Sequence, residues 1–304
     1  MGRAVLTGRG RKRHVGGHPW IYADDVASLE AEPGELVPVH APDQSVLGWA
    51  LASTTSRIAL RFVTRTSAAP GPELWRERAR AAVAHRRALG LLGARDACRL
   101  VGGDADGFPG LVIDRYGDAL VLQSGCQGSD RHRDAWLAAV EEALGQPISR
   151  VLDRSDSSTR THEELEKRVE WLRGETSEPV EVEEPASDGL PALRYEVSLT
   201  EGHKTGHYLD QRANRAEAAR FVREARVLDA FSYDGLFGIR AAQAGARSVL
   251  CLDQSEEALA RALRNAERNG VAARLATEKV NAMHDLRARA ESEARFELVI
   301  ADPP

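Results

Sequence analysis

The feature that most constrains the fold is the alternation of strand and helix patterns over residues 191–304. Apolar runs at 226–230, 248–252, 275–280 and 296–301 alternate with helices expected at 215–223, 236–244 and 256–268, the last preceded by Ser255 as its cap residue. Such alternation is typical of βαβ units around a parallel sheet. We therefore predict a Rossmann-like α/β domain, whose ligand site should lie beyond the carboxyl ends of the strands.

Two further domains are predicted before it. Residues 1–70 contain short alternating apolar runs between turn residues, a spacing that suits a small β-barrel. Residues 71–190 mix strand and helix patterns, so we expect a middle α+β domain there. The barrel strands are expected at 36–40, 46–50 and 58–63, and the middle helices at 73–92, 130–144 and 162–170.

Composition narrows the cellular setting. No apolar run approaches the roughly 18 residues of a membrane span, and no targeting segment is visible. We expect a cytoplasmic protein with no membrane partner. The cysteines Cys98, Cys126 and Cys251 are odd in number and include no CxxC pair, so neither a disulfide framework nor a metal site is predicted.

The positive charge is unevenly placed. The net charge of -5 would argue against a nucleic-acid partner if it were evenly spread, but residues 1–20 contain no acidic residue and a Glu-rich stretch at 175–184 compensates them. Nearly all the cations are arginines, which a GC-rich genome or phosphate contact would each explain. The candidates for phosphate contact at the N-terminus are Arg9, Arg11, Lys12 and Arg13.

The first predicted strand end carries Asp229 and the turn residues Phe231, Ser232, Tyr233 and Gly235. Small residues before a helix allow a nucleoside cofactor to approach the backbone closely. The dinucleotide fingerprint GxGxxG is absent. A methionine-derived cofactor has no pyrophosphate and needs fewer glycines. A plain strand-to-helix turn is the alternative.

The second and third strand ends add polar side chains. Asp253, followed by Gln254, could accept both ribose hydroxyls of a nucleoside, or could simply cap the next helix. Asn281, followed by Ala282, could recognise the adenine edge, although an Asn after a strand is usually a turn residue.

Two more segments are candidates for the same site. Pro303 and Pro304 would stiffen the backbone and hold Asp302 against a planar substrate ring, or Asp302 could be a buried loop acid. The loop 202–215 could cover the cofactor, or could be a charged helix start. In the first case Tyr208 or Asp210 would face the nucleoside, and Arg212 and Arg215 would point toward phosphate.

Together these motifs resemble the large-subunit (23S) ribosomal RNA cytosine-C5 methyltransferase family over nearly the whole chain. Members of this family open with a PUA-type RNA-binding barrel, which the basic start and residues 18–22 look like. The resemblance identifies S-adenosyl-L-methionine (SAM) as the cofactor and ribosomal RNA as the partner. It rests further on the segments 99–116, 204–212, 231–235 and 302–304.

The resemblance also implies roles for single residues. Phe231, Ser232 and Tyr233 would line the SAM site, Asp253 would take the ribose, and Asp302 would be catalytic, facing the target base. The chain departs from the family at Asp234 and Leu236, where threonine and glycine are expected, and at Glu164, where glycine is usual.

The C5 mechanism needs a nucleophile. Cytosine C5 is a poor nucleophile, so such enzymes are expected to add a cysteine thiolate to C6 before methyl transfer. The resemblance places this cysteine beyond residue 304, whereas Cys251 is expected to be a core residue. We therefore expect a chain truncated inside its catalytic domain, an incomplete sheet and no turnover. An unpaired sheet edge would favour aggregation or a covering partner, for instance in a homodimer.

Three alternatives stay open at this point. The first is methylation of another base position or of another RNA. The second is a non-catalytic RNA-binding protein with a vestigial nucleotide fold. A nicotinamide oxidoreductase is disfavoured by the missing glycines.

Overall fold

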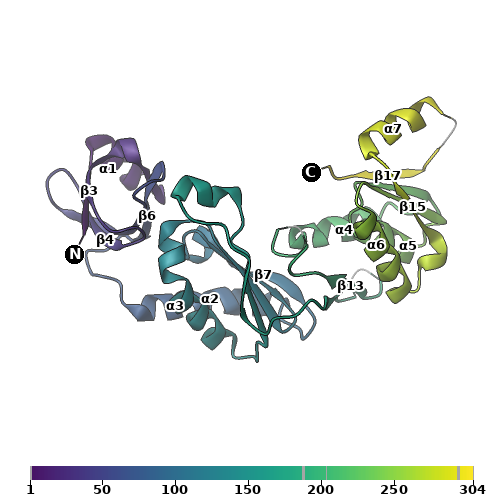
Figure 1. Ribbon diagram of the computed structural model, residues 1–304, viewed down its shortest axis with the longest axis horizontal. Helices are drawn as coiled ribbons and strands as arrows, with labels where there is room; N and C mark the ends of the chain where they lie inside the picture. The colour runs from purple at the N-terminus through teal and green to yellow at the C-terminus, as the bar shows by residue number, and fades with distance from the viewer. Residues whose placement is uncertain (1, 187–188, 203, 293–294, 304) are drawn as a thin grey trace. The chain divides into compact units, whose positions relative to one another are not determined.

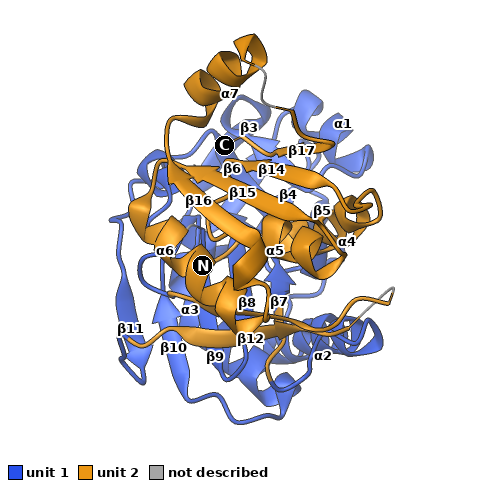
Figure 2. Cartoon of the chain, turned by 90° about the vertical axis from the view of Figure 1, so that its right-hand side faces the viewer, with its two compact units in different colours: residues 1–94, 98–177, 199–206 blue, residues 95–97, 178–198, 207–304 orange. Residues whose placement is uncertain are grey.

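A computed structural model describes residues 2–186, 189–202, 204–292 and 295–303 of the chain. His203 and Pro304, which belong to motifs named above, lie outside the described residues. The chain forms two compact units, shown in different colours in Figure 2. Unit 1 comprises 1–94, 98–177 and 199–206, and unit 2 comprises 95–97, 178–198 and 207–304.

The N-terminal part of unit 1 is a six-stranded sheet that curls around a small apolar core (Figure 1). Side chains alternate along its strands, so that Val37 and Val39 are buried. The three predicted barrel strands are confirmed. The strand order is β2 (Trp20–Tyr22), β6 (Ile58–Thr64), β5 (Val46–Ala52), β4 (Leu36–His40), β1 (Arg3–Leu6) and β3 (Val26–Glu30).

The basic N-terminal segment forms a helix that the sequence did not predict. In α1 (Gly8–Val15), the hydroxyl of Thr7 accepts a hydrogen bond from the N–H of Gly10 at 3.1 Å and caps the N-terminus. Lys12, Arg13 and His14 occupy the last turn, where cations interact favourably with the helix dipole. Periodicity did not predict this helix, because its start contains glycines and its composition is polar.

The second part of unit 1 is a five-stranded mixed sheet packed against two helices. Trp75 of α2 (Pro72–Ala88) and Trp136 of α3 (Gln127–Leu144) meet with ring centroids 4.6 Å apart. The same core includes Leu51 and Val63 from the first sheet, so unit 1 has a core that both sheets share. The strand order is β11 (Glu170–Arg173), β10 (Arg150–Asp153), β9 (Ala119–Ser124), β8 (Leu111–Tyr116) and β7 (Ala97–Gly102).

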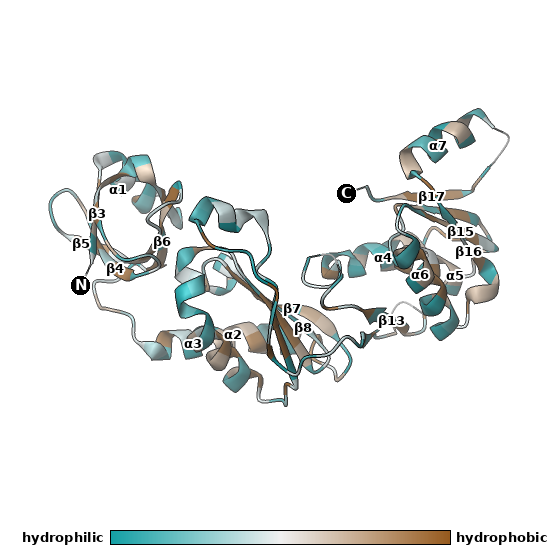
Figure 3. Cartoon of the chain, viewed as in Figure 1, coloured by the Kyte–Doolittle hydropathy of each residue, from teal (hydrophilic) through white to brown (hydrophobic). Residues whose placement is uncertain are grey.

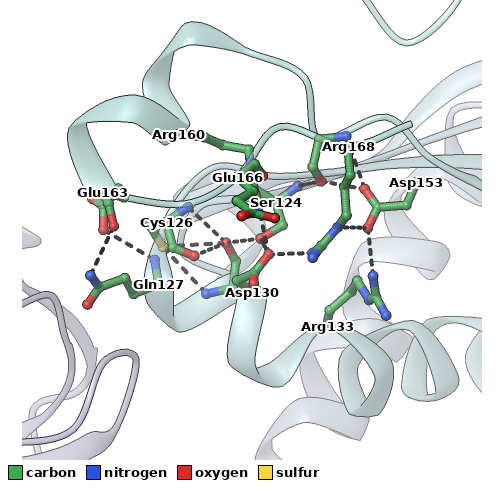
Figure 4. Close-up of polar contacts among 12 residues, drawn as sticks. Ser124, Cys126, Gln127, Asp130, Arg133, Asp153, Arg160, Glu163, Glu166 and Arg168 are labelled. Atoms are coloured by element: carbon green, nitrogen blue, oxygen red, sulfur yellow. Dashed lines mark hydrogen bonds and ion pairs between the residues drawn. The ribbon is translucent and has the colours of Figure 1, made fainter. Parts of the chain in front are cut away.

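The predicted polar helix at 162–170 is wrong. A 3-10 turn spans Ser158–Glu163, and Glu164 ends it with a left-handed φ of 53°. Arg160 and Glu163 are almost fully buried, and their side chains bond inward rather than lying on a solvated helix face (Figure 4). Tertiary ion pairing therefore overrides local helix propensity here.

Within the described residues, unit 2 contains a four-stranded parallel sheet, as the alternating pattern predicted. A two-stranded hairpin of β12 (Val180–Glu184) and β13 (Leu193–Val197) accompanies it. The strand order of the sheet is β16 (Leu275–Lys279), β15 (Ser248–Asp253), β14 (Arg226–Ala230) and β17 (Leu298–Ala301).

Two helices of unit 2 match their predicted positions, and two differ from the prediction. The helix predicted at 215–223 begins and ends earlier, as α4 (Arg212–Ala219), and α7 (Ala282–Glu291) was not predicted. The helices α5 (Leu236–Gln243) and α6 (Glu256–Arg268) match their predicted positions. Figure 3 shows hydrophobic residues on strands such as β7 and β8 and a mixture of hydrophilic and hydrophobic residues on helices such as α7. Among the helices of the described residues, none is both apolar enough and long enough to cross a membrane.

Candidate cofactor site

The turn after β14 has an unusual backbone. Phe231, Tyr233 and Gly235 all have left-handed φ values, of 63°, 51° and 75°. Non-glycine residues rarely adopt this conformation, and such strain is often found at functional sites. The N–H of Ser232 donates to the carbonyl of Leu252 at 2.9 Å, which ties the turn to β15. A Cβ at Gly235 would lie 2.8 Å from the Cβ of Ala262, so this position requires glycine.

Asp253 connects two of the strand ends. Its Oδ2 accepts the N–H of Tyr233 at 2.8 Å, and its Oδ1 accepts the N–H of Ser255 at 2.9 Å. Ser255 itself caps α6, as predicted, by accepting the N–H of Ala258 at 3.2 Å. A carboxylate oxygen has two lone pairs, so both oxygens of Asp253 can accept a further bond from a ligand hydroxyl. Asp253 is half-buried, so a ligand can reach it.

Asp229 is the buried acid of the site. Its Oδ2 accepts the N–H of Gly238 at 2.9 Å, at the start of α5. Burial raises the pKa of Asp229 to about 7, the bond from Gly238 opposes this shift, and the nearby acids Asp234, Asp253 and Asp302 add to it. Three other carboxyl groups therefore act on Asp229 at this edge of the sheet, which favours a ligand carrying positive charge.

Tyr208 and Asp302 belong to the same neighbourhood. Burial raises the pKa of Tyr208, and the charges of Asp302, Asp210 and Asp253 raise it further. The Tyr208 ring lies edge-on to that of Tyr233, with centroids 5.8 Å apart. Asp302 and Asp210 are exposed, so the alternative of a buried acid at Asp302 does not hold.

The remaining candidates differ in their surroundings. Asn281 is exposed, and its Oδ1 caps α7 by accepting the N–H of His284 at 3.2 Å, while Ala282 is buried in the core. Gln254 is exposed beside Asp253, and Arg212 is half-buried at the start of α4. The prediction that Arg215 points toward phosphate is wrong, because it is buried and bonds to Glu184.

Three residues beside the turn were not assigned a role from the sequence. His207 and Asp234 are both buried and form a pair, with Nδ1 and Oδ2 3.2 Å apart. Arg261 of α6 places its guanidinium 5.5 Å from the centroid of the Tyr233 ring. The unexpected Asp at position 234 was the available signal for the pair. Cys251 is fully buried, which confirms that it is a core residue, and burial raises its pKa well above the usual value.

The basic candidates in unit 1 lie on α1 and are partly engaged. Arg9 and Arg13 both bond to the buried carboxyl of Asp25, the latter at 2.7 Å. Arg11 lies 3.4 Å from Asp43, and Lys12 is exposed. In the part of the chain that the structure describes, no group of three or more His, Cys, Asp or Glu side chains is arranged to hold a metal ion.

Comparison with known proteins finds two matching family models and relatives that cover nearly the whole chain. A family model for a PUA-like domain matches residues 5–65, and one named "Conserved hypothetical protein 95" matches residues 213–304. Ribosomal RNA large subunit methyltransferase I of Tolumonas auensis is 35% identical over 94% of this chain and 72% of its own length. The protein of the same name from Aeromonas hydrophila is 34% identical over 100% of this chain and 76% of its own length.

Solved structures agree on the fold. A candidate SAM-dependent methyltransferase from Streptococcus mutans superposes with a TM-score of 0.80 over 100% of this chain and 77% of its own, at 21% identity. A candidate methyltransferase in complex with S-adenosylhomocysteine (SAH) gives a TM-score of 0.82 over 100% of this chain and 76% of its own, also at 21% identity.

The parallel sheet, the strained turn and the relatives together define a SAM-dependent methyltransferase with a PUA-like N-terminal domain. The chain belongs to the ribosomal RNA large subunit methyltransferase I family. The alternative of a vestigial, non-catalytic fold is not favoured, because these relatives are named as methyltransferases.

Proposed function

We propose that this protein transfers the methyl group of SAM to 23S ribosomal RNA and forms 5-methylcytosine. The relatives are named for methylation of large-subunit ribosomal RNA, which supports the substrate class. The observation that carries the cofactor site is Asp253, which bridges the strained turn and the start of α6 while keeping free lone pairs. The segments 99–116, 204–212, 231–235 and 302–304, which resemble the cytosine-C5 methyltransferase family, support cytosine C5 as the target.

In this proposal each strand end contacts one part of the cofactor. Asp253 accepts the ribose hydroxyls, as acids at this position do in dinucleotide folds. The acidic edge around Asp229 favours the sulfonium cation of SAM. The turn after β14 contributes Phe231, Ser232, Tyr233 and Gly235 to the cofactor site. The adenine would be contacted by Gln254, Asn281 and Ala282. The cofactor would be covered by Tyr208, Asp210 and Arg212.

Asp302 is the proposed catalytic residue that faces the target base. It is exposed at the end of β17 and close enough to Tyr208 to act on its ionisation. A base entering beside Tyr208 would then lie between an aromatic ring and a carboxylate. Both groups suit a planar heterocycle with exocyclic N–H donors.

The C5 chemistry sets a further requirement. Methylation at C5 needs a cysteine thiolate that adds to C6 and is later eliminated. Cys98, Cys126 and Cys251 are all buried, so none of their thiols is open to a substrate base. The proposed product therefore depends on a thiolate other than these three, and the product must be tested directly.

RNA binding is proposed for the PUA-like part of unit 1. Lys12 and Arg11 are exposed and suit phosphate contact, whereas Arg9 and Arg13 also stabilise Asp25. A cytoplasmic location and a homodimer stay predictions.

Two measurements test the proposal. Isothermal titration of the protein with SAH should give a saturable heat, and its absence would favour the vestigial alternative. Labelled SAM and 23S ribosomal RNA, followed by nucleoside mass analysis, should identify 5-methylcytidine as the product. A different methylated nucleoside would reject C5 and keep the cofactor assignment. Formation of 5-methylcytidine by residues 1–304 would mean that one of the three buried cysteines becomes accessible during the reaction.

A further inference from the structure

One end strand of the N-terminal sheet carries aromatic side chains that have no role in the proposed chemistry. Strand β2 (Trp20–Tyr22) stands first in the six-stranded order. Ile21 is fully buried in the core of this sheet, so the alternation along the strand places Trp20 and Tyr22 on its outer face. Both are half-buried, as is His18 just before the strand. We call His18, Trp20 and Tyr22 the aromatic edge.

The rings of the aromatic edge are held in place by polar contacts. The centroid of the His18 ring lies 6.0 Å from that of Trp20 and 6.1 Å from that of Tyr22. Nδ1 of His18 is 3.1 Å from the backbone N of Trp20 and 2.9 Å from its carbonyl oxygen, so either tautomer ties the imidazole to the strand. The indole N–H of Trp20 donates to Oδ2 of Asp104 at 3.3 Å. Rings that are already ordered lose little side-chain entropy when a ligand stacks on them.

Two arginines lie against the aromatic edge. The guanidinium of Arg13 is 4.8 Å from the centroid of the Tyr22 ring, where it makes a cation–π contact. Arg65 is exposed and donates to the backbone carbonyls of His14 and His18, at 2.6 and 2.9 Å. Carbonyl groups are neutral, so these two bonds fix the position of Arg65 without cancelling its charge.

The charge beside the aromatic edge is positive on balance. Asp25 accepts from both Arg9 and Arg13, so two cations share one carboxylate. Asp104, which accepts from the indole, is exposed and offsets one further charge, and Arg65 adds one cation. These three arginines therefore outnumber the two acids that contact the same groups. A second copy of this edge would bring like charges together, which disfavours it as the occupant.

Half-buried rings with adjacent cations are the combination that binds single-stranded nucleic acid. Every unpaired base has an aromatic face, which stacks on Trp, Tyr, His or a guanidinium plane, and arginine also pairs with the phosphates on either side. Bases inside a duplex are stacked on one another, so a duplex offers only its phosphates and sugars to such a surface.

We propose that the aromatic edge binds unpaired nucleotides of the RNA substrate: a base stacks on the rings of His18 and Trp20, and Arg13 and Arg65 contact the adjacent phosphates. This inference rests on the proposed RNA binding by the PUA-like part of unit 1. It adds that the RNA is single-stranded where it meets β2, so that the aromatic edge selects a loop, a bulge or an end rather than a helix.

Fluorescence anisotropy of the full chain with a labelled oligouridine, alone or paired with oligoadenosine, separates stacking from charge. Trp20→Ala should weaken binding of the single strand about tenfold and leave binding of the duplex within about twofold. Trp20→Phe keeps a stacking face and should bind the single strand within about threefold of the unsubstituted protein. The matched control is the half-buried Trp171 of β11, and Trp171→Ala should change neither affinity. The melting temperature is recorded for every variant, so that loss of folding is recognised.

Two further readouts respond to contact with RNA and not to stability. Trp20 is one of five tryptophans, and the intrinsic fluorescence of the protein should fall when unlabelled oligouridine stacks on it. This fall should be lost in Trp20→Phe although binding persists. Arg65→Gln should reduce the slope of log affinity against log salt concentration by about 0.7, whereas Arg65→Lys should keep the slope.

The outcomes are distinguishable. Unchanged affinity of Trp20→Ala for the single strand would overturn the inference, as would a fall in fluorescence that persists in Trp20→Phe. An unchanged salt slope in Arg65→Gln would reject its phosphate contact. A dimer that Trp20→Ala abolishes without any effect on RNA affinity would assign the edge to contact between copies. If the unsubstituted protein binds neither RNA, the proposed RNA binding itself fails, whereas binding that the variants leave unchanged rejects this inference alone.

Discussion

Glu163 in unit 1 and Asp229 in unit 2 are both buried carboxyl groups, but they are compensated in different ways. In unit 1, Glu163 accepts from the guanidinium of Arg61 and the hydroxyl of Ser53, both at 2.8 Å. The half-buried Asp130 accepts from Arg160 at 2.8 Å (Figure 4). In unit 2, Asp229 accepts from a backbone N–H and is surrounded by other acids. Arginine therefore neutralises Glu163, whereas burial and neighbouring acids raise the pKa of Asp229.

The difference indicates two uses of the same residue type. A carboxylate matched with arginine and hydroxyl donors fixes one geometry, and unit 1 uses Glu163 to join the first sheet to the 3-10 turn of the second part. A carboxyl group held next to like charges is poised for a cationic ligand, since binding relieves the repulsion. A buried carboxylate paired with arginine, such as Glu163, therefore indicates a structural role. A buried carboxyl group among like charges, such as Asp229, indicates a candidate binding site.

The largest expected effect comes from breaking the paired group. Glu163→Ala leaves Arg61 buried without its carboxylate and should lower the free energy of unfolding of unit 1 by as much as about 5 kcal/mol. All five tryptophans of the chain lie in unit 1, so tryptophan fluorescence during urea unfolding reports this loss. The control is Glu166→Ala, an exposed neighbour, which should change stability by less than about 0.5 kcal/mol. Equal effects of the two changes would contradict the structural role of Glu163.

The next effect should come from Asp229 and depends on pH. The native state holds a proton on this residue between the ordinary pKa of 3.8 and about 7, where the unfolded chain has released it. The unfolded state binds fewer protons, so stability should fall as pH rises through this window, by on the order of 4 kcal/mol, and then level off.

Asp229→Asn isolates this contribution, because the amide oxygen can still accept the N–H of Gly238 and carries no charge. Unfolding followed by far-ultraviolet circular dichroism should show that the variant gains on the unsubstituted protein as pH rises. A constant difference in stability across the window would mean that the buried carboxyl group is already ionised throughout.

A smaller effect is expected at Asp253 and should appear in binding. Asp253→Asn keeps one acceptor for the turn but replaces a charged acceptor of the ribose hydroxyls. The dissociation constant for SAH should rise about tenfold, which corresponds to about 1.4 kcal/mol. Isothermal titration measures it, with Asp43→Asn on the exposed surface of unit 1 as the matched control. Unchanged affinity would restrict Asp253 to holding Tyr233 and Ser255.

The sequence predicted the features that depend on local patterns, but not the contacts between residues that are distant in the chain. The strands at 226–230 and 248–252 and the polar groups after them followed from local apolar runs, and their register in a parallel sheet brings the ends together. The pairing of His207 with Asp234, and of Arg215 with Glu184, joins segments that are distant in the chain, so no local pattern could reveal either. Where such pairing overrode propensity, as at Arg160, the predicted helix was wrong.

The smallest predicted effect concerns backbone strain beside Glu163. Glu164 has φ 53° and ψ 36°, a left-handed conformation that costs a residue with a Cβ about 1 kcal/mol or more. Glycine, which the resembled family has here, avoids this cost but adds freedom to the unfolded chain, so Glu164→Gly should stabilise unit 1 by up to about 1 kcal/mol. Glu166→Gly is the matched control, because Glu166 has no left-handed φ and should lose about 0.5–1 kcal/mol instead. Urea midpoints read by tryptophan fluorescence should therefore move in opposite directions. A shift in the same direction for both would mean that the carboxylate pairing next to Glu164, rather than its backbone, decides the stability of this turn.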